Sequence, residues 1–146
     1  MGKRKESTSD CQQVVFIACS SRKKNIPGPA KEVYQGTLFK KALVYSLLST
    51  DPANIYILSA KYGILSLNTK IDPYDLTLNT FTKPQLNAWY EMVQRQMIEL
   101  NLNPPFLFLT GVRYNAVFPG KKPLTGLSIG KQLQWFNHHT KRIGLL

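Results

Sequence analysis

The sequence predicts an α/β fold, a single domain with a mainly parallel sheet flanked by helices. Three short apolar segments, residues 13–19, 54–58 and 106–109, have the length and composition of buried strands. Segments with apolar residues at helical spacing lie between them and after the last one. Strands that alternate with helices are joined by crossovers, which pair strands in parallel. We therefore expect helices on both faces of the sheet.

The first helix is expected to begin at Thr37, as its N-cap, and to run to residue 49. Phe39, Leu43 and Leu47 are spaced so that they share one face of this helix, which predicts the buried stripe. Ahead of the helix, residues 25–30 hold two prolines and a glycine, which predict a loop without regular structure.

Two further helices are expected in the second half of the chain. One begins after Thr82, an N-cap residue, with Pro84 near its first position, and ends at residues 103–105, which are Asn-Pro-Pro. The other begins after Ser128 and runs to about residue 139. The apolar stripe of the longer helix comprises Leu86, Trp89, Tyr90, Val93, Met97 and Leu100.

The sequence also predicts what lies outside the domain and what it does not need to bind. Residues 1–11 are polar and charged and are expected to form a mobile basic tail ahead of one domain over residues 12–146. Cys11 and Cys19 lack the spacing of a metal site, so we expect no metal, and we expect no other cofactor. No long apolar run and no apolar signal segment are present, so we expect a cytoplasmic protein without a membrane partner.

The charge balance is strongly basic. Nineteen Lys and Arg against eight Asp and Glu give a formal net charge of +11 and a pI near 9.8. Such a field attracts a polyanion, so we expect nucleic acid as the partner; a basic solvated surface without a ligand is the alternative. The side chains expected to contact nucleic acid are Lys24, Lys40, Lys41, Lys121, Lys122, Lys131, Lys141 and Arg142.

A polar signature follows each predicted strand, at residues 19–24, 59–63 and 110–114. The carboxyl ends of parallel strands meet at one edge of a sheet, where ligands of open α/β sheets bind. We therefore expect a substrate site there, although Ser, Gly and Lys are also ordinary loop residues. The candidate substrate contacts are Ser20, Ser21, Arg22, Tyr34, Gly36, Ser59, Tyr62, Gly63, Tyr74, Thr110 and Gly111.

Cys19 and Lys23 place two nucleophilic groups after the first strand. Neighbouring cations lower the pKa of a lysine, and Arg22, Lys24 and Lys61 are positioned to do so for Lys23. Lys23 then acts as a nucleophile or, in the alternative interpretation, as a phosphate contact. For Cys19, a small core residue at the wall of a pocket is the alternative to nucleophilic catalysis.

Acidic residues near the signatures are scarce, which narrows the choice of a general base. Asp72 and Asp75 flank Pro73-Tyr74 in a rigid turn. For Asp72 the expected role is turn formation beside proline. Asp75 is the candidate general base. The alternative is that Asp75, like Asp72, only helps to form the turn.

These signatures resemble the YaaA superfamily, the peroxide-stress proteins and their shorter relatives. The resemblance covers roughly residues 14–80 and is carried by Tyr34-x-Gly36-x-x-Phe39, by residues 58–63 (Leu-Ser-Ala-Lys-Tyr-Gly) and by residues 72–76 (Asp-Pro-Tyr-Asp-Leu). It implies an α/β domain with nucleic-acid affinity. In role, the chain is most similar to the DpdC group of bacterial systems that place 7-deazaguanines in DNA.

A narrower resemblance is local. Cys19-Ser20-Ser21-Arg22-Lys23 is similar to the Cys-x-x-x-Lys core of archaeosine synthase, whose lysine attacks the nitrile of 7-cyano-7-deazaguanine in transfer RNA. Together the two resemblances imply an enzyme that hydrates this nitrile in DNA to the amide. Lys23 or Cys19 would attack, Asp75 would activate water, and Lys61 with Tyr62 would stabilise charge on nitrogen. A non-catalytic DNA- or RNA-binding protein and a base-excising glycosylase that uses Asp75 are the alternatives.

Overall fold

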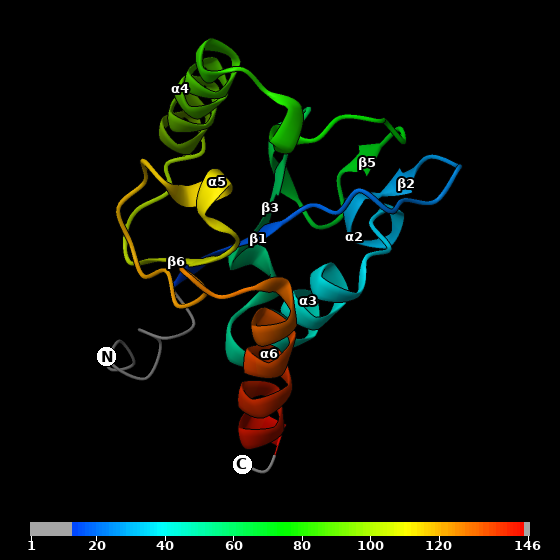
Figure 1. Ribbon diagram of the computed structural model, residues 1–146, viewed down its shortest axis with the longest axis vertical. Helices are drawn as coiled ribbons and strands as arrows, with labels where there is room; N and C mark the ends of the chain where they lie inside the picture. Colours follow the sequence, from blue (N-terminus) through cyan, green and yellow to red (C-terminus); the bar gives the residue numbers. More distant parts are fainter. Residues whose placement is uncertain (1–12, 145–146) are drawn as a thin grey trace, which may run out of the picture.

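The computed structural model describes residues 13–144 as one α/β domain whose main sheet has four strands in the order β4-β3-β1-β6 (Figure 1). The central strand β1 (Val14–Ala18) pairs in parallel with β3 (Ile55–Ser59) and with β6 (Phe106–Leu109). Strand β4 (Gly63–Ser66) returns antiparallel beside β3. The predicted class, a mainly parallel sheet with helices around it, is confirmed. The predicted tail, residues 1–11, lies outside the described residues.

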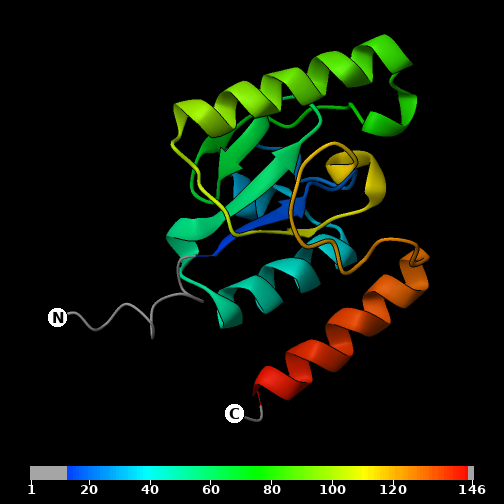
Figure 2. The same cartoon turned by 90° about the vertical axis from the view of Figure 1, so that its left-hand side faces the viewer.

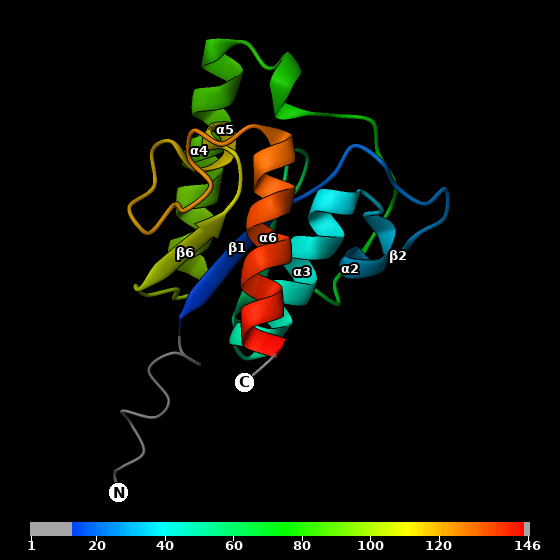
Figure 3. The same cartoon turned by 60° about the horizontal axis from the view of Figure 1, so that its bottom comes forward.

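Helices cover both faces of the sheet. Helix α4 (Lys83–Glu99) lies on one face, and α3 (Thr37–Ser49) lies with α6 (Ile129–Gly144) on the other (Figure 2). Figure 3 shows α6 alongside α3. Because successive residues of a strand point to opposite faces, β1 serves both cores: Val15 and Ile17 pack toward α3 and α6, whereas Val14 and Phe16 pack toward α4.

Two helix starts follow the predicted capping chemistry. Thr82 caps α4 in a capping box, in which its hydroxyl accepts a hydrogen bond from Gln85 N and the Gln85 side chain accepts one from Thr82 N. Ser128 Oγ accepts a hydrogen bond from Lys131 N at the start of α6, which continues past His139 to Gly144. Among the described residues, no helix is both long and apolar enough to cross a membrane.

Helix α3 departs from the prediction at its start and along its face. Gly36 is the N-cap and Thr37 is the first helical residue, so the assignment of Thr37 as N-cap was wrong. The buried residues of α3 are Phe39, Ala42 and Ser46, while Leu47 is 44% exposed. Two of these inward-facing residues, Ala42 and Ser46, are small, and α3 packs against both α6 and β1.

The stripe predicted for α4 is correct over its middle and wrong at its end. Trp89, Tyr90, Val93 and Met97 are buried. Leu100 is the C-cap residue of α4 and is 48% exposed.

The segment predicted as a loop over residues 25–30 contains regular structure. Gly28–Pro29 forms β2, which pairs antiparallel with β5 (Lys70–Ile71), and Ala30 begins the short helix α2 (Ala30–Val33). Proline is tolerated here because the ladder has only two strands, so neither strand needs to donate on its outer side. The ladder ties the loop after β1 to the segment after β4.

Short elements that were not predicted complete the described fold. Single-turn 3-10 helices η1 (Pro52–Asn54) and η2 (Leu78–Thr80) lie in connections, and α5 (Val112–Asn115) follows β6. Strand β4 was also missed, because its Gly-Ile-Leu-Ser sequence follows directly on the polar signature after β3.

Candidate functional site

The carboxyl ends of β1, β3 and β6 lie side by side, as the parallel register requires. The backbone N–H of Cys19 donates to Leu58 O at 3.0 Å, so the polar signatures begin next to one another. The thiol of Cys19 lies 3.3 Å from the hydroxyl of Tyr114, a residue of the third signature that sequence reasoning did not single out. The three signatures therefore meet at one edge of the sheet, as expected.

Lys23 is held in place by its backbone. It forms an isolated antiparallel bridge with Tyr34, and the flanking bonds Lys24 N to Val33 O and Gln35 N to Arg22 O are both 2.8 Å long. The bridge directs the Lys23 side chain over two aromatic rings. Its Nζ lies 4.3 Å from the ring centre of Tyr74 and 5.8 Å from that of Tyr34.

Burial lowers the pKa of Lys23 below its ordinary value, because the half-buried amine is partly removed from water. The charges of Cys19 and Asp75 act in the opposite direction and favour the ammonium form. The pKa of Lys23 is therefore lowered, as the sequence suggested, but by desolvation and not by Arg22, Lys24 or Lys61. A lysine with a lowered pKa is a better nucleophile near neutral pH.

A hydrogen-bonded chain runs beneath this amine. Tyr74 OH lies 2.8 Å from Ser59 Oγ and 2.7 Å from Tyr34 OH. Ser59 Oγ also accepts hydrogen bonds from the backbone of Lys61 and Tyr62, at 3.1 and 3.0 Å. These two bonds use both acceptor positions of the serine, so its hydroxyl donates to Tyr74.

Burial keeps these phenols protonated. Desolvation raises the pKa of Tyr34 to about 12 and that of Tyr74 further above its ordinary range. It likewise raises the pKa of Tyr114, beside Cys19. The site thus offers several hydroxyl donors that remain neutral at physiological pH, and no phenolate nucleophile.

Lys61 and Asp75 lie at the outer side of this cluster. Lys61 is exposed, with its Nζ 5.3 Å from the ring centre of Tyr62 and 6.0 Å from that of Tyr74. Two lysine amines thus approach the ring of Tyr74. Asp75 is also exposed, and its negative charge favours the ammonium form of Lys23.

A cavity of about 380 Å³ opens beside Cys19, between β1, β6, α3 and the start of α6. This volume lies within the usual range of small-ligand pockets. The cavity is lined by the candidate nucleophile Cys19 and by five of the predicted substrate contacts, Ser20, Ser21, Gly36, Thr110 and Gly111. Four more, Tyr34, Ser59, Tyr62 and Tyr74, belong to the cluster around Lys23 and Tyr74, whereas Arg22 lines a separate groove and Gly63 lies in the β3–β4 turn. Cys19 connects the two groups, because it lines the cavity and also acts electrostatically on Lys23.

Gly36 and Gly63 lie at positions where a side chain would clash with its neighbours. A Cβ on Gly36 would lie 2.8 Å from Ser20 Cβ, and Gly36 N donates to Ser20 Oγ at 3.1 Å. Gly63 has a φ of 73° in the β3–β4 turn, where a Cβ would meet the side chain of Gln96. Gly63 is thus fixed by packing, whereas Gly36 brings α3 close to the loop of Cys19.

Two supporting residues were not singled out as site residues by the sequence. Trp89, predicted only as core, donates from Nε1 to Ser59 O at 2.9 Å and so fixes the strand end that carries Ser59. Asn115 is fully buried and donates from Nδ2 to Thr110 Oγ1 at 3.0 Å. Both residues reach the site from a helix, Trp89 from α4 and Asn115 from α5. A sequence signal exists only for Tyr114 and Asn115, which lie in or directly after the third signature.

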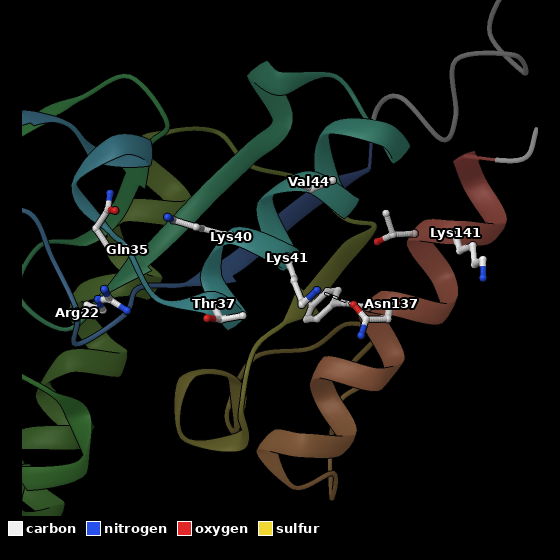
Figure 4. Close-up of a pocket in the computed structure, with 10 residues that line it drawn as sticks. Arg22, Gln35, Thr37, Lys40, Lys41, Val44, Asn137 and Lys141 are labelled. Atoms are coloured by element: carbon white, nitrogen blue, oxygen red, sulfur yellow. Dashed lines mark hydrogen bonds between the residues drawn. The ribbon is translucent and has the colours of Figure 1, made fainter.

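The predicted nucleic-acid contacts do not all line one hollow. Lys40, Lys41 and Lys141 line a groove of about 570 Å³ between α3 and α6, together with Arg22 (Figure 4). Lys121 and Lys122 line a separate depression with Gln13 and Trp135. The other three candidates lie outside these two hollows: Lys24 on the loop after β1, and Lys131 and Arg142 on α6. Among the described residues, no cluster of three or more His, Cys, Asp and Glu could hold a metal ion.

The fold and the site define an α/β domain with a lysine, a thiol and tyrosine hydroxyls gathered at the carboxyl edge of its parallel strands. The chain belongs to DUF6884, a family of unknown function, whose family model matches residues 14–138. No curated protein and no solved structure matches the chain.

Proposed function

We propose that this protein is a cytoplasmic DNA-modification enzyme that hydrates the nitrile of 7-cyano-7-deazaguanine in DNA to the amide. The observation that carries the proposal is the position of Lys23, whose desolvated amine lies over the ring of Tyr74 and under the charge influence of Cys19 and Asp75. The resemblance to the YaaA superfamily and to the Cys-x-x-x-Lys core of archaeosine synthase supplies the substrate. The net charge of +11 favours a nucleic acid as its carrier.

In the first proposed step the neutral amine of Lys23 adds to the nitrile carbon, and the nitrile nitrogen takes up a proton, which gives an amidine. Hydroxyl donors suit this step because charge develops on the nitrogen as the triple bond opens. Tyr74 and Tyr34 both stay neutral, and the one hydroxyl proton of the pair that does not bridge their two oxygens serves as the donor. Lys61 adds a positive charge beside Tyr62. Cys19 is the second candidate nucleophile, and its attack would give a thioimidate.

In the second step water adds to the amidine carbon, with Asp75 as the base that takes a proton from it. The tetrahedral intermediate then collapses, the bond between Lys23 Nζ and carbon breaks, and the amine leaves with a proton. The product is the carboxamide, so the net change is the addition of one water to the nitrile. The exposure of Asp75 is compatible with this role, because water can reach its carboxylate.

The test is incubation of the purified protein with DNA that contains 7-cyano-7-deazaguanine, followed by mass analysis of the nucleosides. We expect a gain of one water with the unmodified protein and no gain with Lys23→Ala. Lys83→Ala, which removes an exposed lysine at the start of α4, is the matched control and should retain the product. Absence of the hydrated nucleoside, or full activity of Lys23→Ala, would refute the proposal.

Lys23→Arg separates a covalent role from a phosphate contact. Arginine retains the positive charge and binds phosphate well, but it is a poor nucleophile because its guanidinium stays protonated. A nucleophilic Lys23 therefore predicts an inactive Lys23→Arg protein, and a phosphate contact predicts an active one.

The two alternatives lead to different products in the same assay. A non-catalytic nucleic-acid-binding protein would leave the nucleoside unchanged and would still bind in a salt-dependent way after Lys23→Ala. A glycosylase that uses Asp75 would leave abasic DNA, which alkaline cleavage reveals. The same assay with the modified base placed in DNA and in RNA shows which nucleic acid is the substrate. This comparison is needed because contacts to phosphate alone do not distinguish DNA from RNA.

A further inference from the structure

The groove between α3 and α6 has the chemistry of an anion site. Its volume is about 570 Å³, and four of its lining residues are cationic: Arg22, Lys40, Lys41 and Lys141. The other six are neutral, so no carboxylate offsets these charges within the groove. Such a lining favours a ligand that carries several negative charges in a row.

The groove adjoins the cavity beside Cys19. Thr37 lines both hollows, and Arg22, which belongs to the loop between Cys19 and Lys23, lines the groove. The backbone bond from Gln35 N to Arg22 O, 2.8 Å long, joins that loop to the segment leading into α3. A ligand in the groove would therefore lie next to the Cys19 cavity and next to the loop that carries Lys23.

The cations are spread along the groove and not gathered at one point (Figure 4). Lys40 extends toward the side of Arg22 and Gln35, and Lys41 lies between the two helices, where its Nζ donates to Asn137 Oδ1 at 2.6 Å. Lys141 lies at the far end on α6. A row of cations fits a row of phosphates better than a single small anion.

We propose that the α3–α6 groove binds the sugar-phosphate backbone of the nucleic-acid strand that carries the modified base, with the base directed toward the Cys19 cavity and Lys23. This inference rests on the proposed function and adds to it the path of the strand. Lys40, Arg22 and Lys141 contact phosphates, and the exposed apolar side chain of Val44, which is 49% exposed, packs against sugar. Lys121 and Lys122 line a different hollow and are excluded from this path.

The experiment compares two double variants that each lower the net charge from +11 to +9 by removing two lysines. Lys40→Ala with Lys141→Ala removes groove cations, and Lys121→Ala with Lys122→Ala is the matched control. Binding of a labelled, unmodified single-stranded DNA of about 12 nucleotides, within the usual site size of such proteins, is measured over a range of salt concentrations.

We expect the groove variant to lose roughly tenfold or more in affinity for DNA at low salt. The slope of the logarithm of the binding constant against the logarithm of the salt concentration should become shallower by about 1.4, which corresponds to two phosphate contacts on a single strand. The control should lose much less, with a slope close to that of the unmodified protein. A melting curve for each variant shows whether it folds, and Lys→Gln substitutions at the same positions provide a second pair.

Equal losses in the two variants, a larger loss in the control, or no DNA binding by the unmodified protein would overturn the inference. Because the DNA is unmodified, this outcome is independent of nitrile hydration. If hydration occurs but binding does not depend on the groove, the proposed function stands and the strand path is wrong. If binding depends on the groove but no hydration is found, the path stands and the proposed chemistry is wrong.

Discussion

The amine of Lys23 lies 4.3 Å from the centre of the Tyr74 ring, although 50 positions of sequence separate the residues. The contact depends on two connections: the bridge between Lys23 and Tyr34, and the hydrogen bond between Tyr34 OH and Tyr74 OH. An ammonium over an aromatic face gains about 0.5–1 kcal/mol at an exposed site and more when water is excluded. Desolvation opposes this gain and favours the neutral amine.

Asp75→Asn should lower the pKa of Lys23 further. The negative charge of Asp75 favours the ammonium form of Lys23, so removing it makes the amine easier to deprotonate. The measurement is the pH dependence of Lys23 modification by an amine-reactive reagent, followed by peptide mass analysis. We expect the midpoint of the profile to move to lower pH.

Asp72→Asn is the control for this experiment, because it removes an exposed carboxylate from the same turn, and Asp72 is not among the charges that act on Lys23. An upward shift in Asp75→Asn, or equal shifts in both variants, would show that Asp75 does not act on Lys23 in this way.

Tyr74→Phe should destabilise the fold while keeping the ring beneath Lys23. The change removes the hydroxyl that bonds Ser59 Oγ and Tyr34 OH, and both partners are fully buried. Loss of a buried hydrogen-bond partner costs about 1–3 kcal/mol. Urea denaturation measures the free energy of unfolding. Tyr56→Phe removes a hydroxyl on β3 outside this network, and a loss as large as that of Tyr74→Phe would contradict the prediction.

Gly36→Ala should impair the site more than the fold. The new Cβ would lie 2.8 Å from Ser20 Cβ and would push the loop that carries Cys19 and Lys23 away from α3. We expect a loss of hydration activity of about tenfold or more, since small displacements of reacting groups are costly to the rate.

Ser20→Gly in the same protein removes the atoms that clash and should restore part of the activity lost in Gly36→Ala. Ser20→Gly alone measures the cost of losing the bond from Gly36 N to Ser20 Oγ. If the double variant is no more active than Gly36→Ala, steric pressure on Ser20 is not the cause of the loss.

Gly63→Ala should lower stability through the β3–β4 turn. Its φ of 73° costs a residue with a side chain about 1–2 kcal/mol. The methyl group would also displace Gln96, whose side chain bonds Ile64 N and Tyr62 O at 2.8 and 3.0 Å. A decrease in melting temperature is expected. Gly130→Ala in α6, where the added Cβ meets nothing within 4 Å, should be neutral or stabilising by up to about 1 kcal/mol.

The sheet could be predicted from the sequence because its three parallel strands are almost entirely apolar. Strand β1 is buried on both faces, and its run of Val and Ile residues is typical of a central parallel strand. Strand β4 is different, since four residues in a hairpin carry too little pattern to be separated from the turn before them. The ladder of β2 and β5 is shorter still and is fixed by a partner that lies more than 40 residues away in sequence.

The site was predicted where polar residues follow strands directly, as with Cys19, Ser59 and Thr110. The sequence did not predict what surrounds them. Burial of Lys23, which determines the direction of its pKa, depends on rings from distant segments, and Trp89 reaches Ser59 from the helix on one face of the sheet. Side-chain contacts of this kind have no local sequence signal, because tertiary packing alone creates them.

The ladder of β2 and β5 has a consequence for how a ligand meets the site. It fastens the stretch after Lys23 to the stretch before Tyr74, so the lysine and its aromatic platform are assembled by folding. Fixing the backbone of a flexible segment costs roughly 1–2 kcal/mol of free energy per residue. Here the segments are already fixed in the folded protein, so substrate binding does not have to supply this free energy. A substitution that weakens this ladder would thus lower the affinity for substrate although it changes none of the reacting groups, because binding would then have to order the two segments.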